Sequence, residues 1–198
     1  GGYWTISNSE QWLAKPGTVG RPPDGVTLKA LDEDGIETPI GQPGPLYRKL
    51  HCFPDFTYNK RHEARREIGH GDLITIGDIG YFDEDGYVFI CDRAKDMVVS
   101  GGANIYPAEI EAELSHMSGI ADSAVFGIPD PEFGEKLMAI VQLQSGIEVS
   151  EDAVMDHLRR HLAGFKVPRL IEFRDTLPRG DDGKIYKRRL RDPYWKGQ

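Results

Sequence analysis

The chain has few cysteines and no long apolar run, and both shortages limit what it can be. Of its 198 residues only Cys52 and Cys91 are cysteines, and they are too far apart to form a C-x-x-C motif. So low a cysteine content indicates a reduced, cytosolic setting rather than a disulfide scaffold. No apolar run approaches the ~20 residues of a membrane-spanning helix, and no segment has the pattern of a secretion signal. We therefore expect a cytoplasmic chain with no membrane span.

Basic residues are also in deficit. The chain has 24 Lys and Arg against 32 Asp and Glu, which gives a formal net charge of -8. An acidic balance disfavours nucleic-acid binding, so the basic run at Lys187, Arg188 and Arg189 is predicted to be a solvated helix face. The length fits one domain or two small ones, and the 39% hydrophobic content suffices for a buried core.

Familiar metal and phosphate motifs are missing as well. The segment from His62 begins like HExxH, but Arg66 stands where the second histidine must be. The two DEDG segments lack the order of an EF-hand loop. Gly183-Lys184 is not a P-loop, because Ile185 takes the place of the required Ser or Thr. We therefore expect no metal ligands among the functional motifs.

The first half of the chain has the pattern of short strands. Val26, Leu28 and Ala30 alternate with Thr27 and Lys29, which is typical of a half-buried strand. Further strands are predicted at 46–50 and on both sides of the second DEDG segment. Short strands joined by Gly-rich turns favour a β-rich subdomain that resembles the remnant of a barrel.

After Asp96 the pattern changes to that of a small α+β domain. Its predicted elements, in order, are a hairpin over 97–105, a helix beginning at Pro107, strands at 123–128 and 137–143, a helix that Ser150 caps and Gly164 stops, a strand at 170–173 and a short helix over 184–191. The fold class is thus α+β, with a hairpin plus a three-stranded sheet and helices in the second part. We place the two domains at residues 1–94 and 95–198.

The strongest functional signal lies in the stretch from Thr75 to Glu111, TIGDIGYFDEDGYVFICDRAKDMVVSGGANIYPAEIE. It contains a Gly-Asp pair, a strand hairpin, a charged junction, a glycine pair and the start of a helix. Near the end of the chain, Pro178 to Lys184 fits the pattern P-x-x-x-x-G-K. In this order the pieces strongly resemble the adenylate-forming superfamily of acyl- and aryl-CoA ligases, peptide-synthetase adenylation domains and luciferases.

The resemblance covers nearly all of this chain but only the C-terminal third or so of such an enzyme. The family's Y-G-x-T-E motif and its Ser/Thr/Gly-rich phosphate loop do not occur, and the sequence opens on Gly1-Gly2 without Met. We therefore expect a piece of a longer enzyme, whose missing N-terminal domain holds the phosphate loop and the acyl pocket. Alone, the piece is expected to be inactive and to bind no cofactor tightly.

The resemblance assigns a catalytic role to Lys184. Its ammonium would reach the substrate carboxylate and the α-phosphate oxygens, where negative charge develops as pyrophosphate leaves. Asp78 would accept hydrogen bonds from both ribose hydroxyls, which suits an acceptor-only carboxylate. Ile76 stands where the family usually has Thr, so no hydroxyl contact is expected there. Arg93 would lie near the ribose and phosphate.

The resemblance further implies that the second domain moves. Adenylation and thioester formation use one site, so one face of the domain must replace another, with Lys95 as the hinge residue. Gly101 and Gly102 would then line the tunnel for the pantetheine arm of CoA, beside Ala103. Glycine suits this place because the lack of a side chain lets the backbone approach a ligand closely.

The implied function is that of an AMP-forming acyl-CoA synthetase, an acid–thiol ligase that uses ATP, Mg²⁺, CoA and a carboxylic acid. Fatty, aromatic and steroid-derived acids are all compatible with the sequence, and so is a homodimer. Two other functions stay open: an adenylation domain that loads a carrier protein, and a non-catalytic binding module of the same fold.

Overall fold

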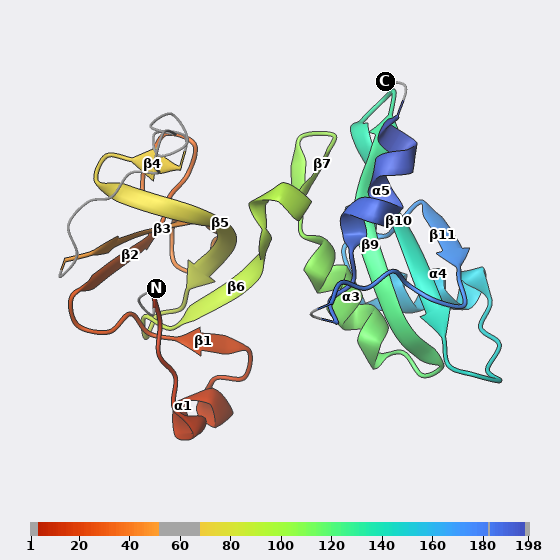
Figure 1. Cartoon of the computed structure of the whole chain (residues 1–198), viewed down its shortest axis with the longest axis horizontal. Coiled ribbons are helices and arrows are strands. Elements are labelled where there is room, and N and C mark those ends of the chain that lie inside the picture. Colours follow the sequence, from red (N-terminus) through yellow and green to blue (C-terminus); the bar gives the residue numbers. More distant parts are fainter. Residues whose placement is uncertain (1–3, 52–67, 182, 197–198) are drawn as a thin grey trace. The chain divides into compact units, whose positions relative to one another are not determined.

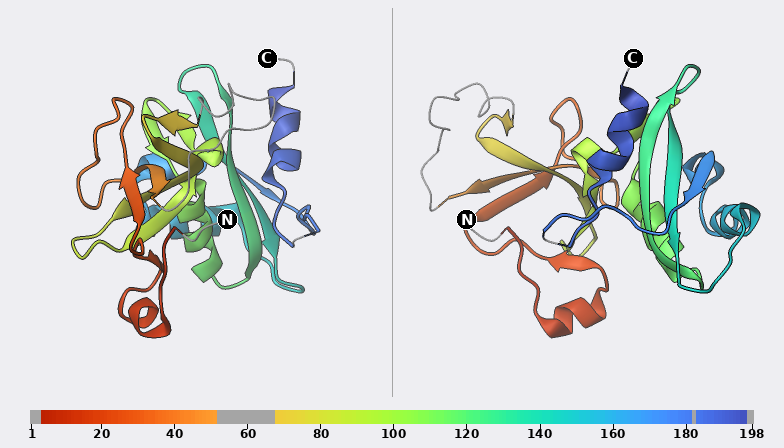
Figure 2. Two further views of the ribbon diagram at one scale, coloured as in Figure 1. Left: turned by 60° about the vertical axis from the view of Figure 1, so that its left-hand side comes forward. Right: turned by 45° about the vertical axis from the view of Figure 1, so that its right-hand side comes forward.

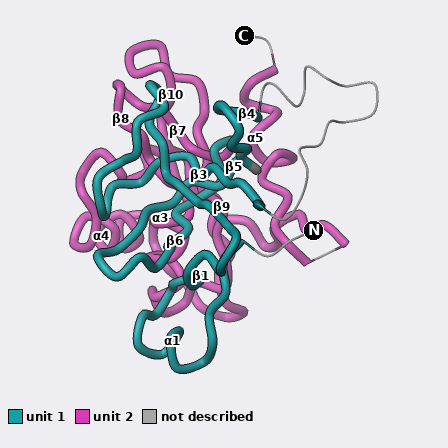
Figure 3. The backbone as a smooth tube through the Cα atoms, turned by 90° about the vertical axis from the view of Figure 1, so that its left-hand side faces the viewer, with its two compact units in different colours: residues 1–95 teal, residues 96–198 magenta. Residues whose placement is uncertain are grey.

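The computed structural model describes residues 4–51, 68–181 and 183–196, except for the side chain of Ile76. The chain forms two compact units, Gly1–Lys95 and Asp96–Gln198, each with its own sheet (Figure 1, Figure 3). The boundary between the units falls after Lys95, one residue later than the boundary that we expected from the sequence. Cys52 and the HExxH-like segment at 62–66 lie outside the described residues.

The first unit is built on an antiparallel sheet. After α1 (Ser9–Ala14), its strands are β1 (Thr18–Gly20), β2 (Val26–Ala30), β3 (Gly44–Leu50), β4 (Gly69–His70), β5 (Leu73–Phe82) and β6 (Val88–Arg93). The order is β1-β6-β5-β3-β2, with β4 paired to β5. Its core consists of Leu28, Ala30, Leu46 and Val88. Within the described residues this path does not close on itself, so the barrel remnant is an open sheet.

Both DEDG segments form the predicted tight turns. The Oδ1 atom of Asp32 accepts from the backbone amides of Asp34 and Ile36, and Asp83 makes the equivalent pair of bonds. Each turn ends on a glycine with positive φ, 76° at Gly35 and 77° at Gly86. An aspartate at the start and a glycine at the end is the chemistry that such turns require.

The second unit confirms the α+β class. Its elements are β7 (Val98–Ser100), β8 (Ala103–Ile105), α3 (Pro107–His116), β9 (Ile120–Asp130), β10 (Gly134–Leu143), α4 (Glu151–His161), η2 (Gly164–Lys166), β11 (Leu170–Phe173) and α5 (Lys187–Trp195). The strand order is β11-β10-β7-β8, with β9 also on β10. The predicted hairpin is therefore not separate from a three-stranded sheet. It joins that sheet where Ser100 pairs with Gly134, and the result is one five-stranded sheet.

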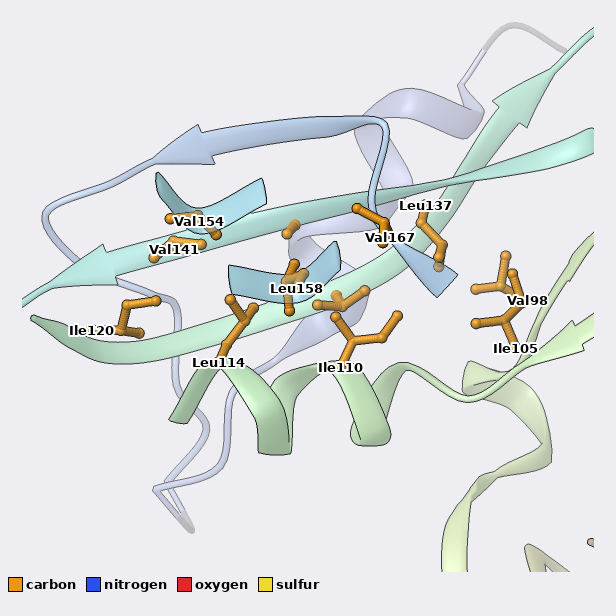
Figure 4. Close-up of a cluster of buried hydrophobic side chains, with 12 residues drawn as sticks. Val98, Ile105, Ile110, Leu114, Ile120, Leu137, Val141, Val154, Leu158 and Val167 are labelled. Carbon is orange, nitrogen blue, oxygen red and sulfur yellow. The ribbon is translucent and has the colours of Figure 1, made fainter. Parts of the chain in front are cut away.

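Alternate residues of β9 and β10 are buried on opposite faces of this sheet. Leu137, Ala139 and Val141 pack with α3 and α4 (Figure 4), whereas Met138 and Ile140 pack with Leu190 of α5. Figure 2 shows α5 along the β9–β10 pair. A strand covered on both faces has a nearly continuous apolar sequence, as β10 does, and β10 pairs with β7, β9 and β11. Helices thus cover both faces of the β9–β10 pair.

Two predicted helix boundaries are wrong. α4 ends at His161 and has Leu162 as its C-cap, while Gly164 begins η2 and does not have a positive φ. The last helix begins at Lys187 rather than Lys184, because Tyr186 donates its backbone N–H to the carbonyl of Pro178 and so closes a loop before the helix. No helix among the described residues is both long and apolar enough to cross a bilayer.

Candidate functional site

Asp78 and Arg93, which the sequence paired in function, are direct neighbours in the first unit. They face each other in the β5–β6 ladder, and Nε of Arg93 lies 2.8 Å from Oδ1 of Asp78. The Asp78 side chain retains 15% of its exposure, whereas that of Arg93 retains 55%. The geometry thus places a half-hidden carboxylate beside a cation that reaches into solvent.

Local backbone geometry determines the position of the Asp78 carboxylate. Gly77, directly before Asp78, has a φ of 81°, and its N–H donates to the hydroxyl of Thr75. Two residues after Asp78, Gly80 leaves no room for a side chain, because a Cβ there would lie 2.4 Å from the carbonyl oxygen of Phe89. Burial raises the pKa of Asp78 above its ordinary value, and the charge of Arg93 partly opposes that rise. Arg93 therefore favours the ionised form that can accept two hydrogen bonds.

Lys95 lies in a single turn of 3-10 helix, η1 (Ala94–Asp96). It is exposed and is the last residue of the first unit. Short 3-10 turns are frequent connectors between other elements, and their hydrogen-bond geometry is poorer than that of an α-helix. The position is compatible with the hinge role that we expect for Lys95.

The glycine pair forms the two-residue turn of the β7–β8 hairpin. Gly101 and Gly102 have φ values of 57° and 80°, and Ser100 pairs with Ala103 across the turn. Two consecutive positive φ values are the geometry of a type I′ hairpin turn, which glycine adopts without strain. Gly101 also has little space, since a Cβ there would lie 3.1 Å from the Phe133 ring.

An open groove with a volume of ≈ 860 Å³ runs beside this turn. Its lining includes Gly101 and Ala103 from the hairpin, and Phe133 and Phe165 as aromatic walls. Three cationic side chains also line it: Lys136, Arg159 and Arg169. The Arg169 guanidinium stacks over Phe133, 5.0 Å from the ring centroid. Such a lining suits an extended ligand with apolar and anionic parts.

Lys184 is exposed and lies in the loop between β11 and α5. Backbone bonds close this loop on both sides: Gly180 donates to the carbonyl of Lys184, and Arg179 and Ile185 form an isolated bridge. The Arg179 side chain donates to the carbonyl of Gly183 at 2.6 Å and also forms an ion pair with Asp122 of β9. These contacts attach the segment that carries Lys184 to β9.

The hollow around this loop has a volume of ≈ 480 Å³. Besides Lys184 its lining includes Asp122, Ser123 and Glu111. Glu111 accepts from the backbone N–H of Val125 at 2.6 Å and pairs with Lys187 at 2.7 Å, which anchors the start of α5. The structure thus supports the loop from β9, α3 and α5 at once.

The two candidate surfaces of the second unit lie at opposite ends of the β9–β10 hairpin. The Lys184 hollow takes in Asp122 near the start of β9, whereas the groove takes in Phe133 in the turn after Asp130. At ~3.3 Å per residue, about 25 Å of strand separates Asp122 from Asp130. The two linings have no residue in common.

Several of these residues were not found from the sequence. Arg179 sits inside the terminal motif, but nothing in the sequence indicated that it would reach Asp122, a residue 57 positions away. Lys136, Arg159 and Arg169 come from separate elements and meet only at the groove. Pairing between distant segments carries no local signal, so these contacts required the fold.

The chain is similar in sequence to AMP-binding enzymes. Residues 109–184 match the family described as the AMP-binding enzyme C-terminal domain. The long-chain-fatty-acid–CoA ligase FadD13 of Mycobacterium tuberculosis (strain ATCC 25618 / H37Rv) is 37% identical over 98% of this chain and 38% of its own length. The fatty acid–[acyl-carrier-protein] ligase ScoC of Streptomyces coeruleorubidus is 39% identical over 89% of this chain and 34% of its own length.

A solved structure gives the same result at the level of the fold. ATP-bound MatB from Rhodopseudomonas palustris has a TM-score of 0.83 and 37% identity, and the match covers 91% of this chain and 36% of MatB. The chain therefore spans about a third of the length of the proteins that it matches.

Proposed function

The chain belongs to the adenylate-forming AMP-binding enzymes and matches their C-terminal part, and on this premise we propose that it is the C-terminal portion of an ATP-dependent acyl-CoA synthetase. The intact enzyme would activate a carboxylic acid as an acyl-adenylate with release of pyrophosphate, and then pass the acyl group to the thiol of CoA with release of AMP. Mg²⁺ would enter with ATP as part of that substrate. The reduced thiols that we infer place this chemistry in the cytoplasm.

One observation carries the proposal. The exposed lysine and the glycine turn lie at opposite ends of one hairpin, and the hollows around them have no residue in common. A single active site cannot meet both surfaces at once, but a unit that turns about its connection can present one and then the other. Two successive half-reactions at one site require such an exchange.

Lys184 serves the first half-reaction. Its ammonium lies on a loop that hydrogen bonds and an ion pair hold in place, so little reorganisation is needed when negative charge develops on the carboxylate and phosphate oxygens. Preorganised charge of this kind is usually the largest single contribution to catalysis. Asp78 and Arg93 bind the ribose and the phosphate of the adenylate.

The groove serves the second half-reaction. The turn at Gly101 and Gly102 admits the narrow pantetheine arm, and the aromatic walls cover its apolar parts. Lys136, Arg159 and Arg169 neutralise the phosphates of the CoA nucleotide, because cationic side chains bind phosphate oxygens strongly. The likeness to CoA ligases supports CoA as the acceptor.

A second candidate acceptor follows from the likeness to ScoC, which is named as a fatty acid–[acyl-carrier-protein] ligase. A carrier protein also offers a pantetheine thiol but lacks the adenine nucleotide of CoA. The acceptor test is therefore to compare CoA with free pantetheine in the full-length enzyme. If CoA is the acceptor, Arg169→Ala raises KM for CoA by about tenfold or more and leaves KM for pantetheine unchanged, since one charge-assisted bond contributes ~1.5–3 kcal/mol. If the acceptor is a carrier protein instead, the wild type and Arg169→Ala would have the same KM for CoA.

A further inference from the structure

A cluster of two histidines and a glutamate lies outside both surfaces described above. His157 and His161 are one turn apart on α4, and Glu113 projects from α3. Their candidate ligand atoms all lie within 4.8 Å of one another. None of the three lines the Lys184 hollow or the groove at Gly101.

Both imidazole rings lie close to one carboxylate oxygen of Glu113. Oε1 of Glu113 lies 2.8 Å from Nε2 of His157 and 3.3 Å from Nδ1 of His161. The two imidazole rings are 4.6 Å apart, centroid to centroid. Nδ1 of His161 also lies 2.8 Å from the carbonyl oxygen of His157, and Nε2 of His157 lies 3.3 Å from that of Glu113, so each nitrogen must give up this contact to bind a metal ion.

From this geometry we propose that Glu113, His157 and His161 form a binding site for a divalent transition-metal ion, with Zn²⁺ the best fit. Two histidines at i and i+4 on one helix face with a carboxylate from a neighbouring element are a common zinc ligand set. Imidazole nitrogens select transition metals over Mg²⁺ and Ca²⁺, which prefer oxygen ligands. No metal ligands were expected from the sequence, although the H-x-x-x-H spacing is visible in it.

Two of the three distances between ligand atoms are close to those of tetrahedral coordination, and the third is within 4.8 Å. Bonds of ~2.0–2.2 Å to a tetrahedral zinc place the ligand atoms about 3.3–3.5 Å apart. The 3.3 Å pair already has this separation, and the 2.8 Å pair must open by only about half an ångström. Water would complete the fourth position, since the His161 side chain is 47% exposed.

The helices that carry the ligands are rigid. Val154 and Leu158 of α4 and Leu114 of α3 have no solvent exposure, and all three belong to the core between these helices and the sheet (Figure 4). Because the ligands come from both helices, the ion would cross-link α3 to α4. By this cross-link the ion would stabilise the second unit at a place apart from both candidate surfaces, and the proposal does not rest on the ligase function.

Zinc titration of the purified, chelator-treated chain tests this site. In competition with a chromophoric zinc indicator, we expect one equivalent of Zn²⁺ to bind to the wild-type chain. Removing a residue that only hydrogen-bonds to a metal ligand weakens metal binding ~10–100-fold. His157→Ala removes a ligand itself, so it should weaken zinc binding by about 100-fold or more. Glu113→Gln should also weaken binding, and it keeps the size of the side chain. His116→Ala removes an exposed histidine of the same α3 and should bind zinc like the wild type.

Two further readouts separate coordination from adventitious binding. Co²⁺ in place of Zn²⁺ should produce an intense visible d–d absorption band in wild type and His116→Ala, and not in His157→Ala. Saturating Zn²⁺ should raise Tm by about 5 °C in the wild type and leave that of His157→Ala unchanged, because only the folded site binds the ion. Absence of saturable zinc binding to the wild type, or equal binding in His157→Ala and His116→Ala, would overturn the proposal.

Discussion

Arg179 pairs with Asp122, and through this pair the loop that carries Lys184 is tied to the first residues of β9. The same guanidinium donates to the carbonyl of Gly183, directly before Lys184. One planar side chain thus joins the strand to the loop, a task for which arginine is better suited than lysine because its donors have a fixed geometry. The position of Lys184 therefore depends on a residue that need not touch any substrate.

Arg179→Lys in the full-length enzyme is expected to lower kcat of adenylation by about 10–100-fold, because a misplacement of ~1 Å in a catalytic group can cost that much. KM for ATP should stay nearly constant, since the residue positions Lys184 and does not bind the nucleotide. Pyrophosphate release measures both quantities. The matched control is Arg188→Lys, because Arg188 pairs with Asp192 on its own helix and does not contact the Lys184 loop through that pair. Equal losses in the two variants would contradict the positioning role.

Asp78→Asn should have opposite effects on stability and on nucleotide binding. Burial raises the pKa of Asp78, so its ionised form destabilises the folded state at neutral pH, and this cost disappears as the pH falls below the ordinary carboxyl range. The variant should therefore unfold at a higher temperature than the wild type at pH 7, and the difference should vanish in acid. Affinity for ATP should fall in the full-length enzyme. Thermal unfolding from about pH 3 to 7 measures the first effect, and a lower Tm at pH 7 would contradict it.

Gly101→Ala should disturb the turn and the second half-reaction together. The φ of 57° costs an alanine ~1–2 kcal/mol, and its Cβ would press on the Phe133 ring. We expect a loss of that size in the free energy of unfolding, measured by urea denaturation. In the full-length enzyme, transfer from acyl-adenylate to CoA should slow while adenylation is spared. Gly164→Ala, where φ is not positive and the added Cβ meets no atom, is the stability control.

Leu158→Ala tests the core beneath the second unit. The side chain is fully buried between α4 and the sheet, and removal of such a leucine leaves a cavity that costs ~2–5 kcal/mol. Urea denaturation should report this loss, whereas the exposed Arg160→Ala on the same helix should change the free energy of unfolding by less than ~0.5 kcal/mol. A loss below ~1 kcal/mol for Leu158→Ala would mean that this core is poorly packed.

The order and type of the elements were predictable because they depend on local patterns. The alternation of Val26, Leu28 and Ala30 indicated β2, and Ser150 caps α4 as expected, with its hydroxyl accepting from Ala153. The α+β class and the family follow from the same patterns. The wrong start at Lys184 has a structural cause, since the bond from Tyr186 to Pro178 closes a loop before the helix. At the other boundary the chain leaves the helix at Leu162, which is extended with φ -122° and ψ 155°, two residues before Gly164.

The candidate site was predictable only where one motif holds all its parts. Asp78 and Arg93 lie in one hairpin, and Gly101 and Gly102 form one turn, so the sequence alone could name them. The Arg179–Asp122 pair and the cationic groove join separate elements and could not be read from any single segment. The same holds for Glu113 with His157 and His161, where the histidine spacing was visible but its carboxylate partner was not.

The central claim is that Lys184 acts in adenylation alone, and separate assays of the two half-reactions test it most directly. In the full-length enzyme carrying Lys184→Ala, we predict that ATP-dependent pyrophosphate release falls by about 10²–10³-fold, the effect of removing one preorganised group that stabilises developing charge. Thioester formation from supplied acyl-adenylate and CoA should stay within about twofold of the wild type, because that step does not use the lysine. Equal loss of both half-reactions would contradict the account.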